Sequence, residues 1–135
     1  MKLIIQGEPV AKGRPRFKVV GKFVTTYTPA KTKKEEKKVI EEIKKQFKEE
    51  PFVCPISVHI VFLFPIPKSY TKRQKNGLEL NFFRHCKKPD CDNLAKLYLD
   101  AMNGLVYKDD CQIYALSLSK FYVKDEKGRV EISVE

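Results

Sequence analysis

The 135-residue chain carries 27 Lys plus Arg against 17 Asp plus Glu, so its formal net charge is +10. A hydrophobic fraction of 42% with only 6 glycines excludes a disordered or fibrous chain, and the length is typical of one domain. The charge excess makes nucleic acid the leading expected partner, because polyanions bind basic proteins through counterion release.

The sequence contains no segment typical of a membrane or secreted protein. The longest apolar run, residues 56–66, falls far short of the roughly 20 residues that a membrane span requires. The N-terminus lacks the apolar core of a signal peptide, so we expect a cytoplasmic protein with no membrane partner. The four cysteines lack the spacing of zinc ligands and are expected to be free thiols: Cys54, Cys86, Cys91 and Cys111.

The N-terminal part of the chain predicts strands. Residues 2–6 form the first strand, and a loop broken by Gly and Pro covers residues 7–16. The Gly-Lys pair at 21–22 then predicts a tight hairpin between strands at 17–20 and 23–27.

A long helix is expected next. Thr28 is predicted to be its N-cap, with Pro29 at its first position, and the helix ends before Pro51. Its later half places four apolar residues on one face: Val39, Ile40, Ile43 and Phe47.

The middle of the chain predicts a buried strand and a long loop. Residues 56–64 alternate between apolar and polar at first and then become apolar throughout, which is typical of a central strand. Residues 65–89 are polar, basic and without sustained periodicity, so we expect a loop that holds at most a helical turn.

The C-terminal part predicts a second helix and two strands. Asp92 is the expected N-cap of the helix, which stops at the Asn-Gly pair 103–104, and the strands cover residues 111–123 and 129–134. The order of elements predicts an α+β fold in one domain, residues 1–135, with a mixed sheet and two helices on one face.

Acidic side chains gather before the second helix. If the approach to that helix is extended, Asp90 and Asp92 point the same way and can share one hard cation such as Mg²⁺, which is usually held by one or two carboxylates plus substrate phosphate. Lys96 lies one helical turn beyond. It either stabilises charge on a phosphate or pairs with Asp92 and Asp100.

A second acidic pair, Asp109-Asp110, precedes the strand that begins near Cys111. Alternation along a strand turns only one of the two carboxylates inward, and the pattern does not select between them. Taken singly, each acid in either pair is more often a helix cap or a solvated turn residue; the combination is what indicates a metal site.

The two acidic motifs closely resemble those of the RusA family of Holliday-junction resolvases. The family pattern appears here as Pro89-Asp90-Cys91-Asp92-Asn93-Leu94-Ala95-Lys96 and Asp109-Asp110-Cys111-Gln112-Ile113. The resemblance extends to Gly7-Glu8-Pro9 through Arg14-Pro15-Arg16, and to Pro67-Lys68-Ser69 through Lys72-Arg73. It implies a homodimer that introduces paired symmetrical nicks into four-way junction DNA and uses Mg²⁺, with Mn²⁺ as a substitute.

The resemblance also implies roles for individual residues. Asp90, Asp92 and Asp110 bind the metal, Asp109 is the lesser candidate, and Lys96 is an essential cation.

The loops supply the expected phosphate contacts. These cations are Lys12, Arg14, Arg16, Lys68, Lys72, Arg73, Arg84, Lys87 and Lys88, although any single one is equally well a solvated surface residue. The pair Phe82-Phe83 either stacks on unpaired bases or packs against the core. Two alternatives stay open: a DNA-binding module without catalysis, and a metal-dependent nuclease acting on RNA or flap DNA.

Overall fold

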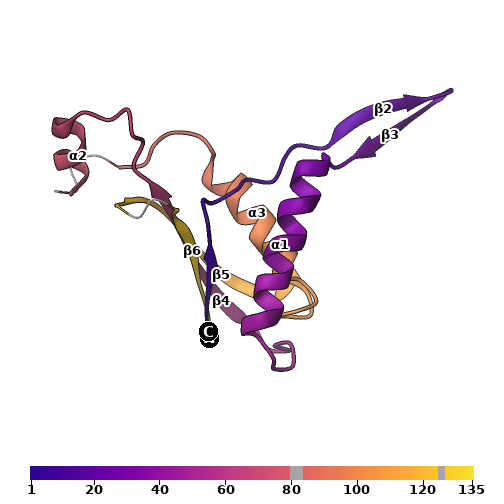
Figure 1. The fold of residues 1–135 in the computed structure, drawn as a ribbon. Helices are drawn as coiled ribbons and strands as arrows, with labels where there is room; N and C mark the ends of the chain where they lie inside the picture. Colours follow the sequence, from indigo (N-terminus) through magenta and orange to yellow (C-terminus); the bar gives the residue numbers. More distant parts are fainter. Residues whose placement is uncertain (80–83, 125–126) are drawn as a thin grey trace.

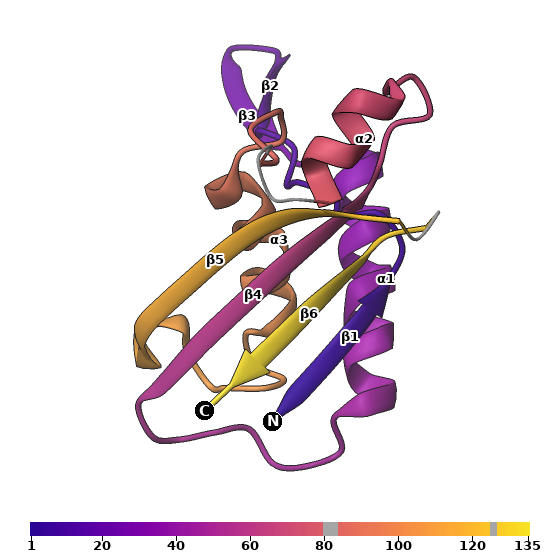
Figure 2. The same cartoon turned by 90° about the vertical axis from the view of Figure 1, so that its left-hand side faces the viewer.

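The computed structural model describes residues 1–79, 84–124 and 127–135. Its main sheet has the strand order β1-β6-β4-β5 (Figures 1 and 2). The strands are β1 (Lys2–Gln6), β4 (Ile56–Pro65), β5 (Ile113–Val123) and β6 (Arg129–Val134). β4 pairs with β5 in parallel, whereas β4 with β6 and β1 with β6 are antiparallel. The α+β fold with a mixed sheet is therefore confirmed.

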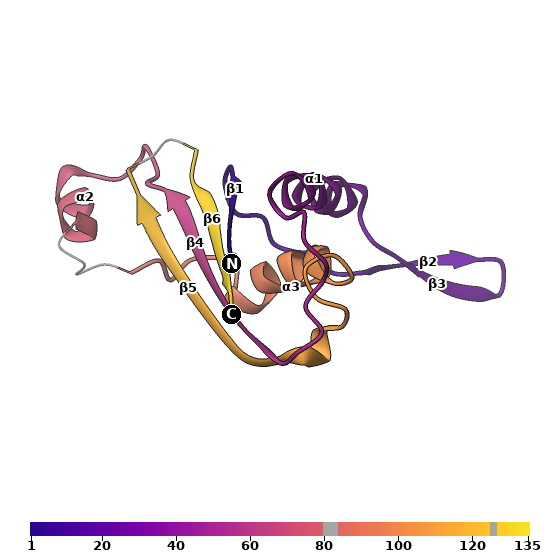
Figure 3. The ribbon, with the colours of Figure 1, turned by 90° about the horizontal axis from the view of Figure 1, so that it is seen from below.

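The helices α1 (Ala30–Gln46) and α3 (Cys91–Met102) cover one face of this sheet (Figure 3). Alternate side chains of β4, from Ile56 to Phe62, are buried against Leu94 and Leu97 of α3. Burying a side chain of this size contributes about 1.5–3 kcal/mol. The core thus fixes α3, and with it the acidic motif at its beginning, against the sheet.

The predicted hairpin is present but does not join the main sheet. β2 (Arg16–Val20) and β3 (Phe23–Tyr27) form a separate two-stranded sheet that projects away from the body (Figures 1 and 3). Gly21 opens its turn at φ +62°, a conformation that glycine adopts without steric cost.

The expectation of two helices is wrong, since the described residues contain a third α-helix. This helix, α2 (Lys72–Glu79), lies inside the segment expected to be a loop and stands apart from α1 and α3 (Figure 3). Thr71 and Gln74 form a capping box: the Gln74 Oε1 accepts from the Thr71 N–H, and the Thr71 Oγ1 accepts from the Gln74 N–H. No helix in the described parts of the chain is long and apolar enough to cross a membrane.

Three predicted element starts are also wrong. Pro29 is the N-cap of α1 rather than its first residue, because its ψ of 141° is extended. Asp90, not Asp92, is the N-cap of α3. A short 3₁₀ helix, Asp110–Gln112, precedes β5, which therefore begins at Ile113.

Candidate active site

Two exposed carboxylates stand at the N-terminus of α3. Asp90 is exposed and extended at φ −71°, and its side chain makes no capping hydrogen bond. Asp92 is exposed in the first turn. Asp90 and Asp92 were expected to point the same way along an extended segment, but this is wrong because Cys91 and Asp92 are already helical. The two acids lie close together because both stand at the start of α3. Negative charge is favoured there by the unpaired N–H groups and the helix dipole.

Lys120 of β5 holds the loop that leads into this helix start. Its ammonium donates to the carbonyl oxygens of Lys87 and Pro89, at 2.9 Å each. The Lys88–Pro89 peptide bond is cis. Lys120 was missed in the sequence, although it is the one cation inside an otherwise uncharged strand segment.

The basic loop before β2 closes the other side of the helix start. The Lys12 N–H donates to the Asn93 carbonyl oxygen at 2.9 Å. A cavity of about 300 Å³ is lined by Arg14, Lys88, Pro89, Asp90 and Asn93. Two predicted DNA-binding cations, Arg14 and Lys88, thus border the same hollow as the predicted metal ligand Asp90. This arrangement suits a phosphate group approaching a carboxylate-bound cation.

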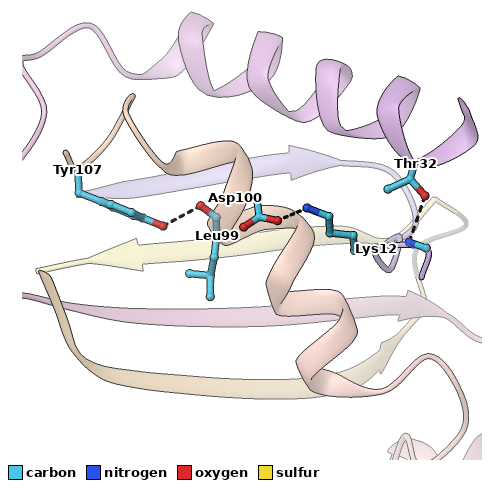
Figure 4. A network of polar contacts seen from close by, with 6 residues as sticks. Lys12, Thr32, Leu99, Asp100 and Tyr107 are labelled. Carbon is cyan, nitrogen blue, oxygen red and sulfur yellow. Dashed lines mark hydrogen bonds and ion pairs between the residues drawn. The ribbon is translucent and has the colours of Figure 1, made fainter. Parts of the chain in front are cut away.

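Lys12 itself is occupied by an ion pair with Asp100, which is partly buried (Figure 4). The alternative in which Lys96 pairs with Asp92 and Asp100 is wrong, since neither ion pair is present among the described residues. Lys96 is exposed one turn beyond Asp92, and it forms no ion pair with any residue that the structure describes. Its ammonium is available to a ligand.

The later acidic pair has divided roles. The Asp109 Oδ1 accepts from the Cys111 N–H, and the Asp109 N–H donates to the Gln112 Oε1, both at 2.9 Å. This capping box holds the pKa of Asp109 below its ordinary value, chiefly through the Cys111 N–H. Asp110 is exposed, and its carboxylate takes no part in the box.

Asp110 lies far from Asp90 and Asp92 within one chain. It stands just before the start of β5, where Ile113 is paired with Ile56, whereas the loop before Asp90 is tied to Lys120 near the other end of β5. Seven residues of strand span about 23 Å, and Figure 2 shows the two ends of α3 at opposite ends of the sheet. In the described ranges, no three His, Cys, Asp or Glu side chains are close enough to hold a metal ion.

Most of the remaining predicted cations lie on α2 or in the loops on either side of it. Lys68, Lys72 and Arg73 are exposed on or before α2, and Lys87 lies 5.0 Å from the centre of the Tyr70 ring. Phe82-Phe83 lies outside the described residues.

His85 lies beside this group. Its ring is tilted against that of Phe64, with centroids 4.3 Å apart, and stacks on that of Tyr122 at 4.5 Å; burial lowers the pKa of His85. It therefore contributes to the packing between β4 and β5.

The chain is similar to a protein of Bacillus subtilis (strain 168) described as "Uncharacterized protein YqaN", with 38% identity over 137 residues covering 99% of this chain and 94% of that protein. The family model described as "Endodeoxyribonuclease RusA" matches residues 6–135, a range that includes both acidic motifs. The chain therefore belongs to the RusA family of endodeoxyribonucleases.

Proposed function

We propose that the protein is a Mg²⁺-dependent nuclease that resolves four-way DNA junctions by paired symmetrical nicks in recombination and repair, with Mn²⁺ as a substitute. The observation that carries the proposal is the pair of exposed carboxylates, Asp90 and Asp92, bordered by cations of three different segments. Membership of an endodeoxyribonuclease family supports the reaction class.

The site residues have the chemistry that phosphodiester hydrolysis needs. Mg²⁺ prefers oxygen ligands and is usually bound by one or two carboxylates plus substrate phosphate, so Asp90 and Asp92 suit it. When bound, the ion would supply Lewis-acid polarisation of the phosphate and activation of water. Lys96 would stabilise charge on the phosphate, while Arg14 and Lys88 would hold neighbouring phosphates.

Asp110 joins this site only if a second copy supplies it. Within one chain it lies at the far end of α3, so a complete set of three carboxylates requires two chains that run in opposite directions. A two-fold axis across an antiparallel pair produces that arrangement, because it places the start of one strand beside the end of the other. We therefore propose a homodimer in which Asp110 of each copy faces Asp90 and Asp92 of the other.

β5 is suited to this pairing. It is the edge strand of the main sheet next to β4, and Tyr114 and Leu116 are 74% and 45% exposed on it. An unpaired edge that carries apolar side chains is a ready surface for another strand. The 3₁₀ helix just before β5 carries Asp110. Lys120, near the other end of β5, holds the loop that leads into Asp90 and Asp92.

The test uses a labelled four-way junction, a duplex, a flap and a structured RNA, each with and without Mg²⁺. We expect symmetrical nicks in the junction only with metal, and a loss of at least about 10²-fold for Asp92→Asn with unchanged junction binding. Ser69→Ala, in the loop between β4 and α2, is the control. Binding without cleavage by the wild type would show a DNA-binding module, and preferred cutting of flap or RNA would show a different substrate.

A further inference from the structure

The β2–β3 hairpin carries large apolar side chains that no other part of the described chain covers. Every residue of both strands is exposed, and Phe17 and Phe23 reach 74% and 77% exposure. An isolated two-stranded hairpin is marginally stable in water, and exposed apolar clusters are typical of interaction surfaces. The hairpin is therefore expected to meet a partner.

The apolar residues reach the tip of the hairpin. Val20 is paired with Phe23 across the Gly21-Lys22 turn, and Val19 is paired with Val24 on the opposite face. Two strands stand only about 4.8 Å apart, so this tip is narrow as well as apolar. Such a shape can enter an opened step between bases, as apolar wedges do in proteins that unstack DNA.

The charge of the segment selects a polyanion as the partner. Between Glu8 and Glu35 the chain has no carboxylate. The cations in this interval are Lys12, Arg14, Arg16, Lys18, Lys22, Lys31, Lys33 and Lys34. The same segment of a second copy would be equally positive, so like-charge repulsion disfavours hairpin-to-hairpin contact. Cations interleaved with aromatic residues are typical of nucleic-acid binding.

The hairpin starts beside the acidic pair. Arg14 lines the cavity next to Asp90, and with Arg16 it also lines a second cavity of about 710 Å³ between the loop before β2 and the start of α1. A strand of five residues extends about 16 Å, so DNA whose phosphate reaches Asp90 lies within reach of the tip (Figure 1).

We propose that the hairpin is a wedge that inserts at the branch point of a DNA junction; this proposal rests on the proposed junction nuclease. Phe23, with Val20, enters the opened base step and stacks on an unpaired base, while Lys18 and Lys22 bind the flanking phosphates. The hairpin thus selects DNA in which base pairs are already open, and it does so with residues separate from the acids that cut.

The test places the fluorescent base 2-aminopurine at the branch point, or within one arm, of a four-way junction in EDTA. Wild type should raise the emission of the branch-point label and leave the arm label unchanged. Phe23→Ala should return the emission to that of free DNA and weaken binding by about fivefold or more, the effect of losing one stacked base. Phe23→Tyr should behave as wild type, and so should the control Ile4→Ala, which removes an exposed apolar side chain from β1.

The results separate the two proposals. A wild type that cuts junctions in Mg²⁺ but leaves the branch-point emission unchanged overturns the wedge alone. A rise in emission without cleavage in Mg²⁺ overturns the nuclease and keeps the wedge. If Phe23→Ala keeps the wild-type emission but becomes monomeric in sedimentation, or loses binding to anionic lipid vesicles, the partner is a second copy or a membrane and the wedge is wrong.

Discussion

Asp109 and Asp110 are neighbours with different tasks. The carboxylate of Asp109 accepts a hydrogen bond from the Cys111 N–H in a capping box, whereas the carboxylate of Asp110 is exposed. We predict that Asp110→Asn abolishes junction cleavage, by at least about 10²-fold, and leaves the melting temperature unchanged. Asp109→Asn should lower the melting temperature and retain most of the activity. Equal loss of activity in both variants, measured under saturating DNA, would contradict this division.

The pH dependence of the Asp109 effect has a definite sign. Because its pKa is lowered in the folded state, the stability that it adds is present above the ordinary carboxyl pKa and is lost as pH falls through the lowered value. The difference in melting temperature between wild type and Asp109→Asn should therefore shrink on acidification. Melting curves collected across the acidic range check this.

Lys120 holds the loop that leads into the acidic pair. Lys120→Met removes the two hydrogen bonds to Lys87 and Pro89, and charged hydrogen bonds of this kind contribute about 1.5–3 kcal/mol before screening by solvent. We predict a lower melting temperature and a fall of about tenfold to 10²-fold in kcat, because small displacements of catalytic groups are costly. Lys44→Met on α1 is the control. Wild-type kcat in Lys120→Met would remove the positioning role.

At the scale of elements, the main sheet with α1 and α3 carries the stability, and the hairpin carries almost none. Leu97 of α3 is fully buried, whereas Val24 of β3 is 65% exposed. Leu97→Ala should lower the free energy of unfolding by about 2–5 kcal/mol, and Val24→Ala should leave it within about 0.5 kcal/mol of wild type. Denaturant unfolding measures both. A large loss for Val24→Ala would mean that the hairpin packs against something in solution.

The elements that the sequence did not predict have identifiable signals. The Thr71-Lys72-Arg73-Gln74 run is a capping box, and it marks the start of α2, but the polar composition of the segment indicated a loop. The Asp109 box is the same motif with Asp as cap and Gln112 at its end. Local side-chain hydrogen bonds therefore determine where α2 and the 3₁₀ helix begin, although the polar composition of these segments favours a loop.

At the scale of the whole molecule, an active site shared between two copies can be tested by mixing two variants that are each inactive. Asp92→Asn and Asp110→Asn should each be inactive alone. In a mixed dimer one composite site carries both changes and the other carries neither, so mixing equal amounts should restore nicking at about a quarter of the wild-type number of sites. Gel assays of single nicks measure it.

The matched control mixes Asp90→Asn with Asp92→Asn, both from the same half of the site, and should restore nothing. No recovery in the Asp92→Asn and Asp110→Asn mixture would show that each chain completes its site alone.

The sequence by itself determined the strands, the hairpin, the two core helices and the acidic motifs, because alternation, helical periodicity and turn residues act over a few positions. Only the tertiary structure decided that Lys120 supports the loop before Asp90, that Lys12 is taken by Asp100, and that Asp110 stands at the far end of α3. These are distances between segments far apart in the chain. These distances follow from the packing of α3 along the sheet, because β5 begins next to Asp110 and reaches the loop before Asp90 near its other end.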